Sequence, residues 1–145
     1  MQIARRRLVK LTAGLRQSDE AVRLAYDYLD RLRLSHLAWL QKFDIQLTPT
    51  TLAPPVRIGV FDPRAEDLEA MGAAMFAHIN YTPLQNATGM PAISLPLFET
   101  KDALPLGSQF TAGFGEEAKL LGLAYELEEA QPWVDRWPSF SASRL

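Results

Sequence analysis

Few side chains of this chain could serve as a nucleophile, a general base or a metal ligand. The imidazoles are those of His36 and His78, and the sequence contains no cysteine. The absence of cysteine excludes disulfides, thiol nucleophiles and thiolate metal sites. Neither histidine belongs to an HExxH or HxH pattern or has carboxylates clustered around it. The composition therefore predicts no metal site and no other cofactor.

Ser94 and Ser108 are the serines to consider as local nucleophiles. Both fall in segments predicted to be strands, and Ser94 is expected to face either the core or the other side of the sheet. A serine nucleophile needs a base within hydrogen-bond reach and donors for the oxyanion. His36 and His78 fall in predicted helices, and no spacing directs either ring at a serine. The residues therefore predict no catalytic side chain in this chain.

Polar residues that might contact a ligand lie beside the ends of predicted elements. The stretch QNATGMPAISLPLF places Asn86 and Thr88 just before Gly89, where a short helix is expected to end. Asn86 has one acceptor and two donors next to the free carbonyl groups of that helix end, so a structural role is favoured over a pocket role. We predict Asn86, Thr88 and Gln109 as substrate-binding residues on polarity and position alone.

The same stretch carries three backbone signals. Gly89 tolerates a positive φ and is expected to form a left-handed cap. Pro91 keeps the residue before it extended, which favours the start of a strand. Pro96 has no N–H group, so it is expected at a sheet edge or at a break in the ladder.

Composition indicates a globular chain of one domain, or one piece of a larger one. Its 145 residues are 48% hydrophobic and 22% charged, with a net charge of −2 and a pI near 5.7. These values favour no nucleic-acid partner. The apolar runs are too short to span a membrane. We expect a cytoplasmic protein.

Apolar periodicity and breaker residues predict four helices and three strands. The order helix, strand, helix, short helix, strand, strand, helix indicates an α/β fold with a small mixed sheet, whose antiparallel hairpin is packed by helices. The expected helices cover residues 19–42, 62–79, 82–88 and 116–130. The expected strands cover residues 45–47, 92–97 and 104–111, with a polar hairpin connection at residues 99–103.

The helices carry apolar stripes that are expected to face the core. The first stripe is Ala21, Ala25, Tyr28, Leu29, Leu32 and Leu40, the second is Leu68, Met71, Ala74, Met75 and Ile79, and the last is Ala118, Leu121, Ala124, Tyr125 and Leu127. Trp133 and Trp137 are expected to pack back on the body. With three strands, at least one sheet edge needs cover from a longer chain or from a second copy.

The first 18 residues form a basic segment. Arg5, Arg6, Arg7 and Lys10 precede the first acidic residue, Asp19. A basic start without acids is found both in transit peptides and on the exposed face of a helix. The helical interpretation is favoured, because the segment lacks serine enrichment and an obvious cleavage site.

Four stretches in this order resemble the C-terminal third of the amidase signature family: DIQLTPT, YTPLQNATGMPAISLPL, LPLGSQF and EEAKLLGLAYELEEAQPWVDRWP. The likeness covers most of residues 20–138. It implies the C-terminal part of that family's fold, and hydrolysis of a carbon–nitrogen amide bond through an acyl-serine intermediate in the complete enzyme. The tail EEAQPW is somewhat more similar to hydrolases of small or linear amides than to tRNA amidotransferase subunits.

The catalytic residues that the resemblance implies are a serine nucleophile, a second serine in a cis peptide bond, and a lysine base. They belong to a part of the family upstream of the matched stretches. This chain has no paired serine, and Lys10, Lys42, Lys101 and Lys119 match no catalytic position. The family usually has an apolar residue in place of Ser108.

The resemblance therefore implies a catalytically incomplete, single partial domain over residues 1–145, whose partner is the missing N-terminal portion or a further copy of the chain. The alternative is a non-catalytic, self-associating interaction module, or the remnant of an enzyme. An in-frame Gly/Ser-rich segment upstream would decide for the enzyme.

Overall fold

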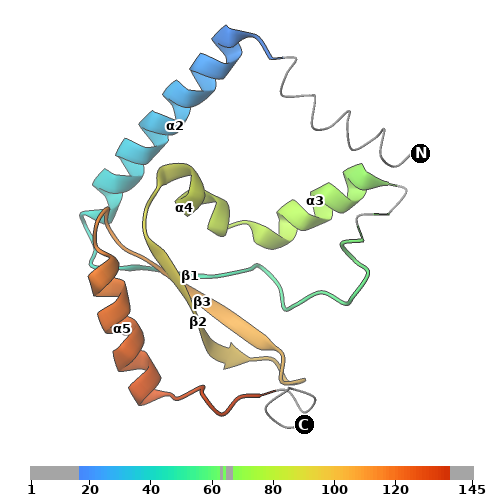
Figure 1. Cartoon of the computed structure of the whole chain (residues 1–145), viewed down its shortest axis with the longest axis vertical. Helices are drawn as coiled ribbons and strands as arrows, with labels where there is room; N and C mark the ends of the chain where they lie inside the picture. Colours follow the sequence, from blue (N-terminus) through green and yellow to red (C-terminus); the bar gives the residue numbers. More distant parts are fainter. Residues whose placement is uncertain (1–16, 63, 65–66, 138–145) are drawn as a thin grey trace.

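The computed structural model describes residues 17–62, 64 and 67–137 (Figure 1). The predicted basic segment lies outside these residues except for its last two positions. The order of elements agrees with the sequence prediction. The elements are α2 (Asp19–Leu40), β1 (Gln46–Pro49), α3 (Leu68–Ile79), α4 (Thr82–Thr88), β2 (Ala92–Glu99), β3 (Pro105–Thr111) and α5 (Glu117–Ala130).

The three strands form one sheet in the order β1-β3-β2. Both pairs are antiparallel, so the sheet, expected to be mixed, is antiparallel across its described strands. The predicted hairpin joins β2 and β3. Its turn is closed by the Thr100 N–H, which donates to the Leu104 carbonyl oxygen at 2.8 Å. The α/β class and the helices packed around a hairpin are confirmed.

The hydrophobic core lies between one face of the sheet and α5, which runs beside the strands in Figure 1. Its buried residues are Leu95, Leu97, Phe110, Ala112 and Leu120. Trp133 packs against this cluster as predicted, whereas Trp137 is 53% exposed and does not.

The predicted buried stripe of α5 is wrong in part. Leu121 and Tyr125 are exposed, while Leu120 is buried and Leu123 packs against the core. The helix carries two overlapping apolar stripes with helical spacing. The sheet covers one of them, and the position of the sheet decides which stripe is buried.

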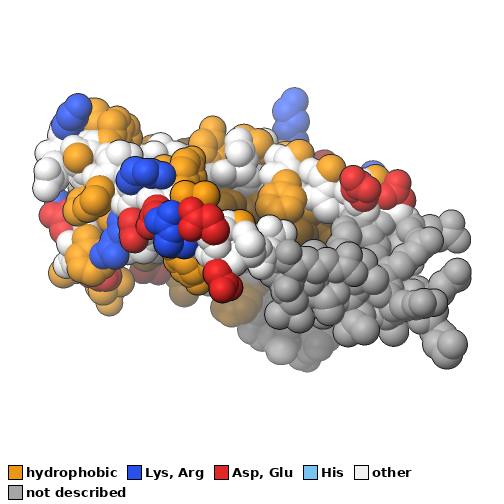
Figure 2. Space-filling model, turned by 90° about the horizontal axis from the view of Figure 1, so that it is seen from above, with side chains coloured by type: hydrophobic (Ala, Val, Ile, Leu, Met, Phe, Trp, Pro, Cys, Tyr) orange, Lys and Arg blue, Asp and Glu red, His pale blue; other side chains and the backbone are white. Residues whose placement is uncertain are grey.

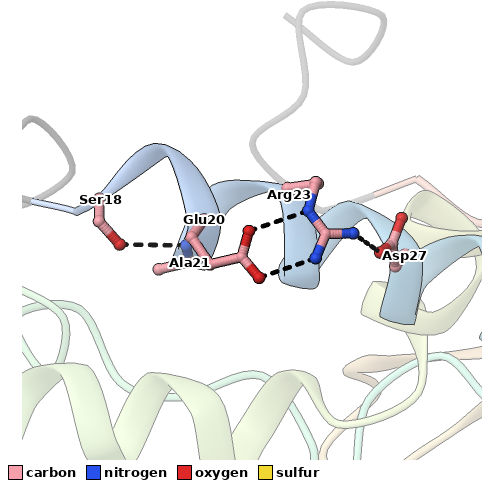
Figure 3. A network of polar contacts seen from close by, with 5 residues as sticks. All are labelled: Ser18, Glu20, Ala21, Arg23 and Asp27. Atoms are coloured by element: carbon pink, nitrogen blue, oxygen red, sulfur yellow. Dashed lines mark hydrogen bonds and ion pairs between the residues drawn. The ribbon is translucent and has the colours of Figure 1, made fainter.

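Helix α2 begins at the predicted cap, where the Ser18 hydroxyl oxygen accepts a hydrogen bond from the Ala21 N–H at 3.2 Å. Arg23 then pairs with Glu20 and Asp27, each at 2.7 Å, on the exposed surface (Figure 3). The hydrogen bond from Arg23 lowers the pKa of Glu20. These contacts stabilise the first turns of the helix from within the helix itself.

The predicted apolar stripe of α2 is covered at one end. Leu40 is 3% exposed, and Leu29 and Leu32 are half-buried. Tyr28 is 61% exposed, and Ala21 and Ala25 are exposed as well, against the prediction. Figure 1 shows α2 extending away from the sheet, and Figure 2 shows hydrophobic side chains among charged ones on the surface seen from above. The physical reason is that no described element packs along this part of the helix.

Helix α3 begins later than predicted. The Asp67 carboxylate accepts hydrogen bonds from the N–H groups of Glu69 and Ala70, so Asp67 is the cap that starts the helix. Asp62, the expected start, instead accepts hydrogen bonds from Arg64. Two capping bonds at Asp67 outweigh the Asp-Pro signal five residues earlier. Met71, Met75 and Ile79 are half-buried, whereas Ala74 is exposed.

The backbone signals around α4 are confirmed. Gly89 has φ 69° and ψ 23° and closes the helix with its N–H donating to the Gln85 carbonyl oxygen at 2.8 Å. Pro96 lies where the ladder between β2 and β3 shifts its register, between Leu95 and Phe98. The Pro96 carbonyl oxygen accepts a hydrogen bond from Arg136, and the Leu97 carbonyl oxygen accepts one from Gln131, so the C-terminal tail covers part of the β2 edge.

Within the described residues, no helix is long and apolar enough to cross a membrane.

Replacing Gly89 with alanine is expected to lower the free energy of unfolding by about 1–2 kcal/mol, because a Cβ disfavours the left-handed backbone. No atom lies within 4 Å of the added Cβ, so the cost is conformational rather than steric. Gly122→Ala is the matched control, because this glycine lies inside α5 with the same free space. The control is expected to stabilise the chain by about 0.5–1 kcal/mol. Urea denaturation of both variants measures the difference, and an equal effect of the two would contradict it.

Candidate functional site

The sheet has an apolar face toward α5 and a polar face on the opposite side. Residues paired across antiparallel strands point to the same side. The register pairs Gln46 with Thr111, Thr48 with Gln109, and Ser94 with Gln109. We call Gln46, Thr48, Ser94, Gln109 and Thr111 the polar face. Its side chains are amides and hydroxyls, so this face can bind polar groups without offering a charge.

Helix α4 covers one end of the polar face through the buried Gln85. The Gln85 amide nitrogen donates to the Thr111 hydroxyl oxygen at 3.1 Å. This bond joins the last turn of α4 to the central strand. It explains the polar turn that precedes β2, because the turn holds a helix against a polar sheet surface.

His36 joins α2, α4 and β1. Its Nδ1 lies 3.2 Å from the Thr88 hydroxyl oxygen, and its Nε2 lies 3.3 Å from Gln46 Oε1. The Thr88 hydroxyl also donates to the Leu84 carbonyl oxygen at 2.8 Å, so it contacts both the ring of His36 and the backbone of α4. The hydroxyl of Thr88 is thus used within the protein, and we assign Thr88 a structural role.

Among the described contacts, no hydrogen bond joins any two of the three predicted substrate-binding residues. Asn86 is exposed, and its side chain makes no hydrogen bond to another described residue. Gln109 is 4% exposed, and its Nε2 has no partner in the described part of the chain. The Thr48 hydroxyl, on the strand beside it, also lacks a partner there. Gln109 is therefore the member of the three whose unused donor is buried, and it belongs to the polar face.

A cavity of about 400 Å³ opens at the other end of the polar face. Thr50, His78, Ser94, Pro96, Pro105 and Gly107 are among its lining residues. The hydroxyl oxygens of Thr50 and Ser94 lie 2.6 Å apart and share a hydrogen bond. The sequence offered no reason for His78 and Ser94 to meet, yet the structure brings both to this cavity.

The described contacts do not join Ser94 to His78 as a nucleophile is joined to its base. The Ser94 hydroxyl pairs with Thr50, and no hydrogen bond joins it to His78 among the described contacts. Ser108 is 7% exposed and is the register partner of Leu95, so it lies on the core face of β3. A general base must reach the proton that it removes.

No Lys, Arg, Asp or Glu is among the described residues that line the cavity. Lys119 pairs with Glu116 at 2.7 Å, and this hydrogen bond together with one from the Gly113 N–H lowers the pKa of Glu116. Lys42 and Lys101 are exposed, and Lys10 lies outside the described residues. No group of three or more His, Asp or Glu side chains suited to a metal occurs in residues 17–62, 64 and 67–137.

Comparison with known proteins finds one family and several relatives. The amidase family profile matches residues 2–121. AmiC of Mycobacterium leprae, named as an amidase, is 46% identical over 106 residues, which are 73% of this chain and 22% of that protein. A 6-aminohexanoate-cyclic-dimer hydrolase of a Pseudomonas species is 35% identical over 69% of this chain and 21% of the relative. The chain thus spans less than a quarter of the length of these relatives.

Solved structures have the same arrangement of elements. A 6-aminohexanoate cyclic dimer hydrolase, solved in complex with its substrate, matches 85% of this chain and 27% of its own, with a TM-score of 0.75 and 31% identity. A glutamyl-tRNA(Gln) amidotransferase protein of Thermotoga maritima matches 93% of this chain and 28% of its own, with a TM-score of 0.60 and 23% identity, which shows the fold alone.

Proposed function

Because this chain belongs to the amidase family, we propose that it forms part of an enzyme that hydrolyses the carbon–nitrogen bond of small amides. The observation that carries this proposal is the family match over residues 2–121. The fold shared with a solved cyclic-dimer hydrolase supports it. The uncharged polar face of the sheet is also suited to an amide, which offers a carbonyl acceptor and an N–H donor.

In this proposal the chain by itself performs no hydrolysis. The Ser94 hydroxyl is paired with Thr50, and Ser108 is buried. Neither serine is hydrogen-bonded to a base among the described contacts. The nucleophile and the base would come from the part of the family fold that the match does not cover. Removal of both groups costs about a millionfold in turnover.

A chimera tests the proposal. Residues 18–137 of this chain would replace the matching portion of the solved cyclic-dimer hydrolase, and hydrolysis of the cyclic dimer would be measured beside the purified chain alone. We expect turnover by the chimera, and neither turnover nor labelling by a fluorophosphonate for the chain alone. A folded but inactive chimera would overturn the proposal. If the chain alone hydrolysed the dimer, and Ser94→Ala or Ser108→Ala abolished that turnover, the active site would lie within this chain.

The alternative function is self-association without chemistry. It is favoured by large apolar side chains on the described surface, including Tyr26 at 66%, Leu34 at 66% and Phe76 at 69% exposure. Apolar surface of this kind favours association with another copy or with the rest of an amidase fold. Sedimentation equilibrium distinguishes the cases, since a compact monomer would contradict self-association.

Two finer statements belong to the proposal. Gln109 is proposed to contact substrate because its buried amide N–H group has no partner among described residues, and the exposed Asn86 is proposed as a more distant contact. A cytoplasmic location is a prediction from composition, and fractionation of cells that express the chain would check it.

A further inference from the structure

The two edges of the sheet differ in what covers them. The order β1-β3-β2 makes β1 and β2 the edge strands. At β2 the Gln131 side-chain amide donates to the Leu97 carbonyl oxygen at 2.8 Å. The Arg136 guanidinium donates to the Pro96 carbonyl oxygen at 2.9 Å, and Trp133 packs against the core between these two contacts. The C-terminal tail therefore occupies the β2 edge where the shift in register leaves two residues without ladder partners.

The β1 edge carries unpaired backbone groups. The Thr50 N–H donates to the Gly107 carbonyl oxygen at 2.9 Å, in the register that the rest of β1 follows. Along an antiparallel strand, residues bonded to one neighbour alternate with residues whose N–H and C=O groups point the other way. The N–H and C=O groups of Leu47 therefore point away from β3, and no described strand lies on that side. Pro49 points the same way, as expected of a proline on an edge strand.

The side chain of Leu47 is uncovered as well. Leu47 is the register partner of Phe110, so it belongs to the apolar face, yet it is 63% exposed whereas Phe110 is 7% exposed. The rings of Trp39, near the end of α2, and Phe43, shortly before β1, lie 4.9 Å apart and are 41% and 53% exposed. Apolar side chains beside unpaired strand groups form a template for the addition of another strand.

A second copy of the chain fits this edge by two-fold symmetry. With Leu47 of one copy opposite Leu47 of the other, the N–H of each donates to the carbonyl oxygen of the other. The same register sets the Ile45 N–H of each copy opposite the Pro49 carbonyl oxygen of the other. The two Leu47 side chains then lie side by side and extend the apolar face across the contact.

Charge and the covered β2 edge both favour a closed pair of chains. Residues 45–52 carry no charged side chain, and the two-fold register sets Asp44 opposite Thr50, so like charges do not meet. A two-fold contact uses the same patch on both copies and therefore closes. Because the tail occupies the β2 edge, the paired chains form one continuous sheet in the order β2-β3-β1-β1-β3-β2 and stop there.

We propose that the β1 edge is a homodimerisation site, at which two copies of the chain pair antiparallel through Leu47. The inference goes beyond the proposed hydrolase function. It rests on the alternative function of self-association, to which it gives a surface, a register and a closed stoichiometry.

Sedimentation velocity of the 145-residue chain over a range of concentrations tests the inference. We expect a reversible monomer–dimer equilibrium without larger species. Leu47→Lys sets two like charges opposite each other and should weaken the dimer at least about tenfold. Leu34→Lys is the matched control and should leave the dimer unchanged, because Leu34 is 66% exposed on α2, outside the sheet. Circular dichroism would verify that each variant is folded.

A mixture of Leu47→Lys with Leu47→Glu tests the register. A two-fold contact through Leu47 sets the opposite charges face to face, so the mixture should regain a dimer at concentrations where each variant alone is monomeric. Leu47→Cys gives an independent measurement, since the chain has no other cysteine. The Cα atoms of a hydrogen-bonded antiparallel pair lie about 5.5 Å apart, within the range of a disulfide. Mild oxidation should link Leu47→Cys into a covalent dimer much faster than Leu34→Cys.

A chain that stays monomeric, or species larger than a dimer, would overturn the inference. So would equal weakening by Leu34→Lys and Leu47→Lys, or a mixture of the charged variants that forms no dimer. A monomeric chain beside an active chimera would assign the β1 edge to a strand of the larger amidase fold, and would leave the proposed function standing. A dimer beside an inactive chimera would do the reverse.

Discussion

Replacing Phe110 with alanine is expected to lower the free energy of unfolding by about 3–5 kcal/mol. Phe110 is 7% exposed at the centre of the apolar face, where it is the register partner of Leu47 on β1 and of Ile93 on β2. Its cluster contains five buried residues, so few neighbours can close the cavity that the ring leaves. A domain has about 5–15 kcal/mol of stability in total, so this loss would remove a large fraction of it.

Urea denaturation followed by circular dichroism and by tryptophan fluorescence would measure this effect. Trp133 packs against the same cluster, so its emission reports on the core. Phe76→Ala is the matched control, because that ring is 69% exposed. The control should change stability by about 0.5 kcal/mol or less. Equal losses for the two variants would show that the core lies elsewhere.

Thr88→Val is expected to cost about 1–3 kcal/mol, the second-largest loss that we predict. The substitution keeps the volume but removes the hydroxyl that forms a hydrogen bond with His36 Nδ1 and donates to the Leu84 carbonyl oxygen. Thr88 is 1% exposed and His36 is 8% exposed, so water cannot replace the lost partner. A buried polar nitrogen without a hydrogen-bond partner bears its full desolvation penalty.

A double-mutant cycle with His36→Leu isolates this bond. The two losses should add to more than that of the double variant by about 1 kcal/mol, because the second substitution removes the group that the first leaves unpaired. Thr51→Val is the matched control, since its hydroxyl bonds locally to the Ala53 carbonyl oxygen at the exposed surface. Additive losses at His36 and Thr88 would refute the proposed bond.

Features that depend on neighbours in the chain could be predicted from the sequence. Ser18 caps α2, Gly89 ends α4 in the left-handed region, and Pro96 coincides with the shift of the strand register. Each follows from the backbone angles or the hydrogen-bonding groups of a few consecutive residues. The sequence also carried the resemblance to the amidase family, which the comparisons confirm.

Features that depend on which elements meet were decided by the tertiary structure alone. The apolar residues of α5 allow two buried stripes, and packing on the sheet selects Leu120 over Leu121. The cavity collects Thr50, His78 and Ser94 from a loop, a helix and a strand that no spacing in the sequence connects. Periodicity states which residues share a face of one element, but the contact between two faces depends on the packing of the whole chain.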